Sequence, residues 1–402
     1  MAGIWFTAGA PPRPPGEIAT LEFSTKDQFA KFPTVSNPPT FALLRSRKLC
    51  NSNPRNLITA AFITIMAEAG LTRATFAKLS PHPYLLANLE PSSQDIPPAR
   101  SNGRAPDEAR TPEVNLSSLS HAHGSSLVRI GDTTAICGVR AETILTTNIP
   151  NYRASNTESE LRDYDLLVPN IELATGSSPQ NLPGGPPSTL AQTLSTRVYS
   201  VLHSSKLLDA ADFRIWHTQT ADPTTADDDE MRDADAEDPD EFSDERQVIA
   251  YWVLYIDIFF ISLDGNQLDA AWAATLAALR DTKLPQARYD PDRELVICSR
   301  KSPKPLSVNG FPIACTAVVF TGKETDRPTE GKYWVLVDPD TLEESLCDET
   351  LTVVADCTGG ATRILSVSKH GGTVLTPEHL RSKQLLGLVE KRWKGFADAM
   401  ST

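Results

Sequence analysis

The sequence predicts an α+β protein of two related halves, each with several strands followed by a helix. Residues 249–279 give the first observation, because they fit one buried strand, a tight turn and a buried helix. The second is a hairpin pattern upstream, in which two β-rich runs flank Gly131-Asp132. The third is that strand-like runs and a closing helix recur after Pro285, which indicates a faint internal duplication.

The stretch 249–279 carries the strongest structural signal in the chain. Its first half is apolar and rich in β-branched and aromatic residues, which is typical of a strand covered on both faces. Asp264-Gly265-Asn266 then supplies turn chemistry. The alanine-rich run that follows has high helix propensity. Its larger side chains recur along one face, at Leu268, Trp272, Leu276 and Leu279.

The N-terminal part of the chain differs from the rest. Its many prolines break any periodicity, so residues 1–65 are predicted to be disordered or a non-native extension, with the functional chain starting near Met66. Residues 66–99 are predicted to hold a short helix, Thr72–Leu79, that Pro81 ends, and then a linker.

The first domain is predicted at residues 100–285, with an acidic insertion at 219–246. Its helix is expected at 189–208, with a buried stripe along one side. The expected strands are 114–116, the hairpin 125–130 and 133–139, the edge strand 166–170 with Pro169, and the anchor strand. The stripe consists of Leu190, Leu194, Val198, Val201 and Leu202.

The second domain is predicted at residues 286–402, as one sheet and one helix. Thr376 and Pro377 are typical of a helix N-terminus, because the threonine caps it and the proline suits its first position. The sheet is expected from strands at 295–298, 313–320, 333–337, 351–356 and 363–367. The inner side of the helix is expected at Leu380, Leu385, Leu388, Val389, Trp393 and Phe396.

The negative charge of the chain is concentrated in one place. The formal net charge is −13, and residues 222–246 account for −11 of it, with thirteen acidic residues against two arginines. The body of the protein is therefore close to neutral. A solvated loop is the simplest interpretation of the insertion, and a dock for a basic partner or a guard against RNA are the alternatives.

No metal site is predicted. The six cysteines include no CxxC pair, and His121 and His123 have no second ligand pair at workable spacing. A magnesium site of Asp257, Asp264 and Asp269 is disfavoured, because the second fits the turn and the third fits the first helical turn. No charged leader opens the chain, so an intracellular protein is expected.

A series of motifs in one order resembles the ribonuclease PH family. The likeness covers roughly residues 80–400 and is closest to ring subunits of the eukaryotic RNA exosome, of the ribosomal RNA-processing protein 43 type. The motifs are Asn102-Gly103-Arg104, Arg110, Asn115, the run 124–134, Cys137-Gly138-Val139, Leu167-Val168-Pro169-Asn170 and Leu263-Asp264-Gly265-Asn266.

The resemblance implies a ribonuclease PH fold, of two β-α halves like ribosomal protein S5 domain 2. It also implies a place in a six-membered ring of related subunits arranged as three heterodimers. A cap of S1/KH subunits covers such a ring, and single-stranded RNA passes through its channel. No cofactor and no membrane are implied, and the expected compartments are nucleus, nucleolus and cytoplasm.

The phosphate-binding position of the family is altered in this chain. Active members have Gly-Gly-Thr-Arg-Thr-Ala after the anchor strand, and the arginine and hydroxyl hold phosphate. The matching residues here are 265–270, with Leu268 in place of the arginine and Asp269 beside it. A charge-assisted contact worth roughly 1.5–3 kcal/mol is therefore lost, and Asp269 is expected to repel a phosphate dianion.

The second catalytic position of the family is also expected to be degenerate. Active members have Asp-x-Asp before a strand, which the resemblance places at Asp348-Glu349-Thr350. Thr350 then stands where the catalytic aspartate is expected. A threonine cannot act as general acid near neutral pH, and such groups typically supply about 10² to 10⁴ in rate.

RNA contacts are predicted to be weak. The loop that contacts RNA in relatives is expected near 177–185, which holds no lysine or arginine. Arg104 and Arg153 remain as candidate backbone contacts, although surface or structural arginines are the simpler interpretation. The sequence thus predicts a non-catalytic scaffold subunit that supports rRNA maturation and mRNA turnover. A phosphate-dependent 3′ to 5′ exoribonuclease with a rearranged site is the alternative, and a free RNA-binding module is less favoured.

Overall fold

The computed structural model describes most of the chain beyond its N-terminal part. The described residues are 72–91, 97–156, 159–182, 184–218, 246–322, 332–372, 374–380 and 382–401. The chain divides into two units, and everything below concerns the second, Gly70–Thr402. The predicted extension 1–65 and the acidic insertion, apart from Arg246, lie outside the described residues.

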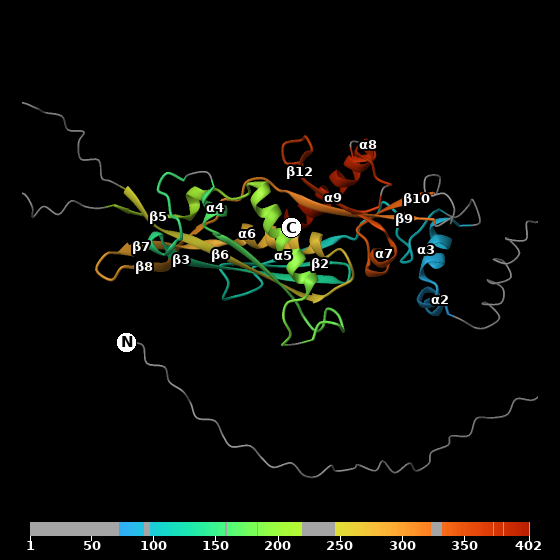
Figure 1. The fold of residues 1–402 in the computed structure, drawn as a ribbon, viewed down its shortest axis with the longest axis horizontal. Coiled ribbons are helices and arrows are strands. Elements are labelled where there is room, and N and C mark those ends of the chain that lie inside the picture. Colours follow the sequence, from blue (N-terminus) through green and yellow to red (C-terminus); the bar gives the residue numbers. More distant parts are fainter. Residues whose placement is uncertain are drawn as a thin grey trace, which may run out of the picture. The chain divides into compact units, whose positions relative to one another are not determined.

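The first sheet has six strands in the order β1-β2-β3-β6-β4, with β5 pairing to β6 (Figure 1). β4 runs parallel to β6 and pairs with no other strand in the described part of the chain, so the predicted edge strand is confirmed. The strands are β1 (Pro112–Leu116), β2 (Gly124–Ile130), β3 (Thr133–Leu145), β4 (Leu167–Leu173), β5 (Arg214–Thr218) and β6 (Arg246–Ser262).

The anchor strand β6 is only partly as predicted. Residues 250–254 are buried on both faces, as expected. Beyond them burial alternates, and Phe259 and Ile261 are 39% and 42% exposed. The difference arises because α5 (Thr189–Ser205) and α6 (Gln267–Asp281) pack on only one face of this half of the sheet.

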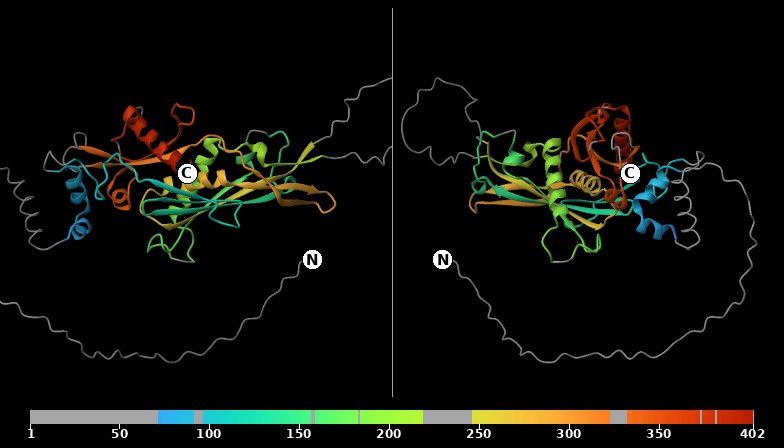
Figure 2. Two further views of the ribbon diagram at one scale, coloured as in Figure 1. Left: turned by 180° about the vertical axis from the view of Figure 1, so that it is seen from behind. Right: turned by 45° about the vertical axis from the view of Figure 1, so that its right-hand side comes forward.

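Helix α6 lies between the two halves of the protein. It contacts β2 and β3 of the first sheet and β9 (Ile313–Thr321) of the second, and every residue from Leu268 to Leu279 is buried. Figure 2 shows strands β1 to β3 of the first sheet, in teal, and the C-terminal sheet, in orange and red, on different sides of this helix.

Of two predictions about the other helices, one is wrong and one is confirmed. Leu190 is 40% exposed and lies outside the buried stripe of α5. The helix is capped by Ser188, and its first buried residue is Ala191. The helix predicted at Thr72–Leu79 ends at Leu79, before Pro81, as expected. Pro81 then begins a second helix that was not predicted, and its missing N–H costs nothing at the first helical position. These helices are α2 (Arg73–Leu79) and α3 (Pro81–Leu89).

The second sheet has four strands in the order β10-β9-β11-β12. The predicted strand at 295–298 is not part of this sheet. It belongs to β8, which pairs with β7 in a separate hairpin, and the sequence pattern did not predict β7. The bounds are β7 (Lys283–Asp290), β8 (Leu295–Pro305), β10 (Tyr333–Val337), β11 (Glu349–Asp356) and β12 (Arg363–Gly371).

The C-terminal helix packs on the second sheet with Val389 and Phe396 buried, as predicted. It forms in two pieces, α8 (Pro377–Leu380) and α9 (Lys383–Ser401). Short elements complete the fold, namely α4 (Glu160–Asp163), α7 (Thr341–Leu346), and the 3₁₀ turns η1 (Thr146–Asn148) and η2 (Ala210–Phe213). Within the described residues, no helix has the length and apolarity needed to cross a membrane.

Candidate functional site

The turn between β6 and α6 is held tightly against the segment before α7. Gly265 has φ +70°, and a Cβ there would lie 2.5 Å from the carbonyl carbon of Asp340. Asn266 is also left-handed, with φ +53°. The local sequence Asp-Gly-Asn favours this backbone, because glycine and asparagine adopt positive φ at low cost. The helix that follows therefore starts directly beside the second domain.

Leu268 lies in the main hydrophobic core and is 5% exposed. Asp269 is 1% exposed and fully engaged. Its carboxylate accepts hydrogen bonds from Asn266 Nδ2 at 2.9 Å, from the Thr316 N–H at 3.1 Å and from Thr316 Oγ1 at 2.7 Å. Burial raises the pKa of Asp269. The side chains at the predicted phosphate position thus serve as core and as a link between α6 and β9.

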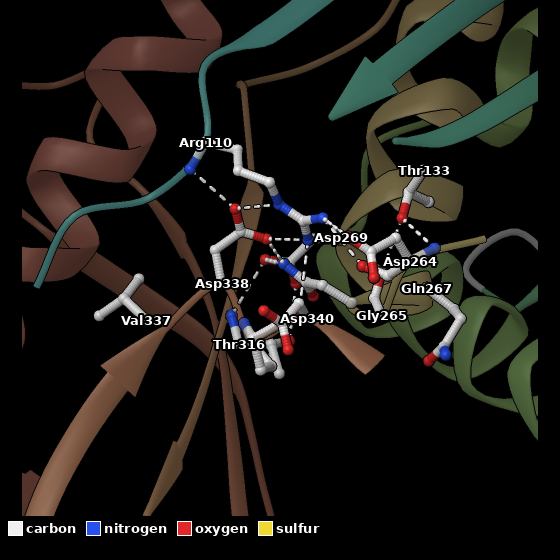
Figure 3. A network of polar contacts seen from close by, with 12 residues as sticks. Arg110, Thr133, Asp264, Gly265, Gln267, Asp269, Thr316, Val337, Asp338 and Asp340 are labelled. Atoms are coloured by element: carbon white, nitrogen blue, oxygen red, sulfur yellow. Dashed lines mark hydrogen bonds and ion pairs between the residues drawn. The ribbon is translucent and has the colours of Figure 1, made fainter. Parts of the chain in front are cut away.

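Asp338 is the hub of the polar network around this turn (Figure 3). Its buried carboxylate accepts from Arg110 Nε and Nη2, both at 2.9 Å, and from the Arg110 N–H at 2.8 Å. Asn266 Nδ2 also donates to it at 2.6 Å. Burial opposes the charge, but the Arg110 hydrogen bonds and the charge of Arg392 outweigh it and hold the pKa of Asp338 well below its usual range.

A second buried ion pair lies close by. The Arg100 and Glu343 side chains are fully buried and form a two-point contact. Arg100 also donates to the C=O of Val337 at 2.6 Å. Glu343 and Asp340 form the capping box that starts α7. The arginines of the segment before β1 are therefore used to attach that segment to the second sheet.

The N-terminus of α6 already carries an anion from the chain itself. Glu344 accepts from the N–H of Asn266 at 2.7 Å and from Gln267 Nε2 at 3.2 Å. A helix N-terminus favours negative charge and is a common place for phosphate. Here the chain's own carboxylate occupies that position, so a phosphate dianion at this helix end would meet like charge.

The structure brings the two predicted degenerate positions to the same region. Thr350 lies on β11, opposite Val318 of β9. Two residues further along β11, the Thr352 hydroxyl is 3.0 Å from the Thr316 hydroxyl, which in turn donates to Asp269. Asp269 is therefore linked to β9 and β11 through Thr316 and Thr352, and the assignment of Thr350 to the catalytic position stays a prediction.

The two predicted RNA-contacting arginines are not brought together. Arg104 bonds Asp338, at 3.4 Å to its carboxylate and 3.3 Å to its C=O, and burial is the main cause that lowers the pKa of Arg104. Arg153 is exposed, and its backbone bonds the Tyr164 hydroxyl. Arg104 therefore has a structural partner, whereas the Arg153 side chain faces solvent.

The loop near 177–185 borders a cavity of about 690 Å³ together with the end of β4 and the start of α5. Phe259 and Glu172 also line it. No lysine or arginine is found among the described residues of the cavity wall. Weak contact between this loop and RNA stays a prediction.

No group of three or more potential ligands that could hold a metal ion occurs among the described residues. His123, one of the two histidines considered, accepts the N–H of Ala141 at its Nδ1 atom. Asp257 hydrogen-bonds Asn170 at the open face of the sheet, and Asp269 is enclosed by its own partners. Each of these side chains has a structural role in the fold.

Sequence reasoning missed most of the polar network. Asp338, Glu344 and Arg392 were not singled out, and Arg110 served only as a motif residue. One signal was available for Arg392, which lies three residues after Val389 and four before Phe396, within the apolar stripe of α9. A charged residue at such spacing predicts a buried partner.

Comparisons with known proteins place this arrangement in a class. The 3′ exoribonuclease family matches in both of its parts, domain 1 over residues 108–285 and domain 2 over residues 310–382. An archaeal structure, the Archaeoglobus fulgidus exosome with RNA bound to the active site, superposes with TM-score 0.53 at 23% identity, over 79% of this chain and 96% of that one. That likeness shows the fold.

Individual relatives define the family further. The exosome complex component rrp43 of Schizosaccharomyces pombe is 30% identical over 77% of this chain and 92% of its own length. The exosome complex component Rrp42 of Archaeoglobus fulgidus is 26% identical over 73% and 85%. The chain belongs to the 3′ exoribonuclease, or ribonuclease PH, family. The predicted ribonuclease PH fold and the resemblance to the ribosomal RNA-processing protein 43 type are both confirmed.

Proposed function

We propose that this protein is a non-catalytic ring subunit of the RNA exosome, which supports 3′ to 5′ RNA processing and degradation by shape alone. Its relatives in yeast and archaea are named as exosome components, which supports this assignment. Its expected partners are other ribonuclease PH subunits, S1/KH cap subunits and RNA in the channel. The expected compartments are nucleus, nucleolus and cytoplasm.

The state of the α6 N-terminus is the observation that carries the proposal. Leu268 is in the core, and the Glu344 carboxylate already accepts from the N–H of Asn266, the residue that caps this helix, and from the Gln267 side chain. Two arginines of the network around the turn already have acidic partners, since Arg110 forms an ion pair with Asp338 and Arg100 forms one with Glu343. A phosphate ion placed at this helix end would meet the carboxylates of Glu344 and Asp269, so the binding of phosphate as the nucleophile of phosphorolysis is disfavoured.

The second half of the chemistry is missing for a separate reason. Thr350 has a hydroxyl that stays protonated across the physiological range, so it cannot supply a proton to a leaving oxygen. The hydroxyls of its neighbours Thr316 and Thr352 bond one another and Asp269. This region therefore acts as a structural joint between β9, β11 and α6.

Exposed apolar surface supports a role in assembly. Phe259 and Ile261 project from the open face of β6, and a soluble protein that leaves such side chains exposed often covers them with a partner. We infer that this face contributes to contacts within the ring.

An assay for phosphate-dependent release of nucleoside diphosphates from an oligoadenylate tests the proposal. The chain is assayed alone and within the ring with its partners, beside an Asp348→Asn variant. No turnover above background supports the scaffold role. Turnover that Asp348→Asn abolishes would establish the alternative, an exoribonuclease with a rearranged site. The mass and composition of the complex that co-purifies with the chain test the assembly part separately.

A further inference from the structure

Strand β10 leaves part of its outer edge unpaired. It is the terminal strand of the second sheet, and the N–H of Gly322 donates to the C=O of Lys332 at 3.0 Å across to β9. Because backbone groups alternate in an antiparallel ladder, the N–H and C=O groups of Tyr333, Val335 and Val337 must point away from β9.

Among the described residues, partners are found for only one end of this edge. The N–H of Val337 donates to the C=O of Pro106 at 3.1 Å, and its C=O accepts from Arg100 at 2.6 Å. Within the part of the chain that the structure describes, no group bonds the outward backbone of Tyr333 or Val335. An open strand edge of this kind is a template for a further strand.

A groove runs beside the unpaired edge. It has a volume of about 470 Å³ and lies between β10 and the helices α8 and α9. Its walls are mostly apolar, with Val335, Leu375, Leu385 and Leu388 among the side chains that line it. Alternate side chains of an added strand would point into this groove, as apolar side chains do where a peptide extends a sheet.

An acidic side chain at one end of the groove favours a ligand with a basic residue. Asp107 lines the end next to Pro106, its side chain is 60% exposed, and its one ion pair, to Lys391, is long at 3.8 Å. No lysine or arginine is found among the described residues that line the groove. The groove therefore offers an acidic end to a cationic side chain.

We propose that β10 is a docking strand for an extended peptide from a partner protein. The peptide pairs with the backbone of Tyr333 and Val335, places alternate apolar side chains in the groove and sets a basic residue against Asp107. This role does not depend on the proposed place in the exosome, because it uses the outward backbone of Tyr333 and Val335 and not the α6 turn.

Fluorescence anisotropy with the full-length chain tests the proposal. The probe is a labelled peptide that alternates valine and threonine for six residues and carries arginine at one end. Two further probes carry N-methyl groups on every second amide, in the two possible registers. In an added strand only one register of amides faces β10, so one methylated probe should bind about tenfold more weakly and the other about as well as the parent.

Two further measurements make the result specific to this edge. Replacing the arginine of the probe by glutamate, or Asp107 by lysine (Asp107→Lys), should weaken binding severalfold, and making both changes should restore it. Hydrogen exchange at the amides of Tyr333 and Val335 should slow when the parent probe binds. The proposal is overturned if the parent probe does not bind at millimolar concentration, if both methylated probes bind equally, or if those two amides keep their exchange rates.

Discussion

Arg110 and Asp338 meet through two parallel hydrogen bonds, Nε to Oδ2 and Nη2 to Oδ1, although 228 residues separate them in sequence. The same guanidinium donates to the C=O of Asp264 at 2.8 Å. One side chain therefore fixes three segments: the entry to β1, the end of β10 and the turn before α6. The pair is buried, and such planar two-point contacts are among the stronger hydrogen bonds in proteins.

Loss of the Asp338 charge should destabilise the fold strongly. We expect Asp338→Asn to lower the free energy of unfolding by about 3–5 kcal/mol, because it leaves buried arginines without their counter-charge. Urea denaturation followed by circular dichroism measures the change. Asp264→Asn is the matched control, since its side chain is 39% exposed and 3.4 Å from Arg110, and its cost should stay below about 1 kcal/mol. Equal costs for the two variants would contradict the assigned role of Asp338.

The same carboxylate should make stability depend on acid. The pKa of Asp338 is depressed in the folded state, so its stabilisation is complete above the unfolded pKa, near 4, and is lost as pH falls below that value. The expected loss is about 1.4 kcal/mol per pH unit for this one group. Asp269 and Glu344, whose pKa values are raised by burial, act in the opposite direction.

The difference between wild type and Asp338→Asn isolates that contribution, because both proteins share the other groups. Denaturation midpoints measured from pH 5 down to pH 2.5 should converge as the wild type loses its advantage. Parallel curves would show that Asp338 does not titrate below its unfolded value.

Leu268 should behave as a core residue. Leu268→Ala is expected to cost about 2–5 kcal/mol of stability, because the side chain is 5% exposed within the main cluster. Leu190→Ala is the control, and its 40% exposure predicts a change within about 0.5 kcal/mol. Thermal unfolding distinguishes them, and a small effect at Leu268 would mean that it faces an open site after all.

Gly265 should tolerate no side chain. Gly265→Ala forces a residue with a Cβ into φ +70°, which costs roughly 1–2 kcal/mol, and the methyl group would also collide with the backbone of Asp340. Gly387→Ala in α9 is the control, because nothing lies within 4 Å of its Cβ position and alanine favours a helix by about 1 kcal/mol. Opposite shifts in melting temperature are expected, and a neutral Gly265→Ala would show that the turn is loose.

Local sequence patterns predicted the parts of the fold that depend on neighbours in the chain. The hairpin of β2 and β3 follows from its turn, and α6 follows from helix propensity together with the turn before it. Patterns could not predict that β8 pairs with β7 outside the second sheet, because the apolar run at 295–298 suggests a buried strand, whereas Leu295 and Ile297 are 58% and 49% exposed in the hairpin. They also could not predict that one face of β6 is exposed to solvent beyond Tyr255, because burial depends on which helices of the fold pack on that face.

The candidate site shows the same division. The residues at Leu268, Asp269 and Thr350 could be located from the resemblance, because each lies in a motif of fixed order. Glu344 and Asp338 could not, since their roles arise from partners 72 to 228 residues away. An isolated acidic residue in a sequence gives no sign of which arginine or helix end it will meet.

Helix α6 is buried on all sides and packs against the sheets of both domains. If the polypeptide were divided at the tip of the β7–β8 hairpin, the C-terminal fragment would lose the surface on which β9 rests. The N-terminal fragment would in turn expose a row of alanines and a tryptophan to water. Neither domain is therefore expected to fold when separated from the other.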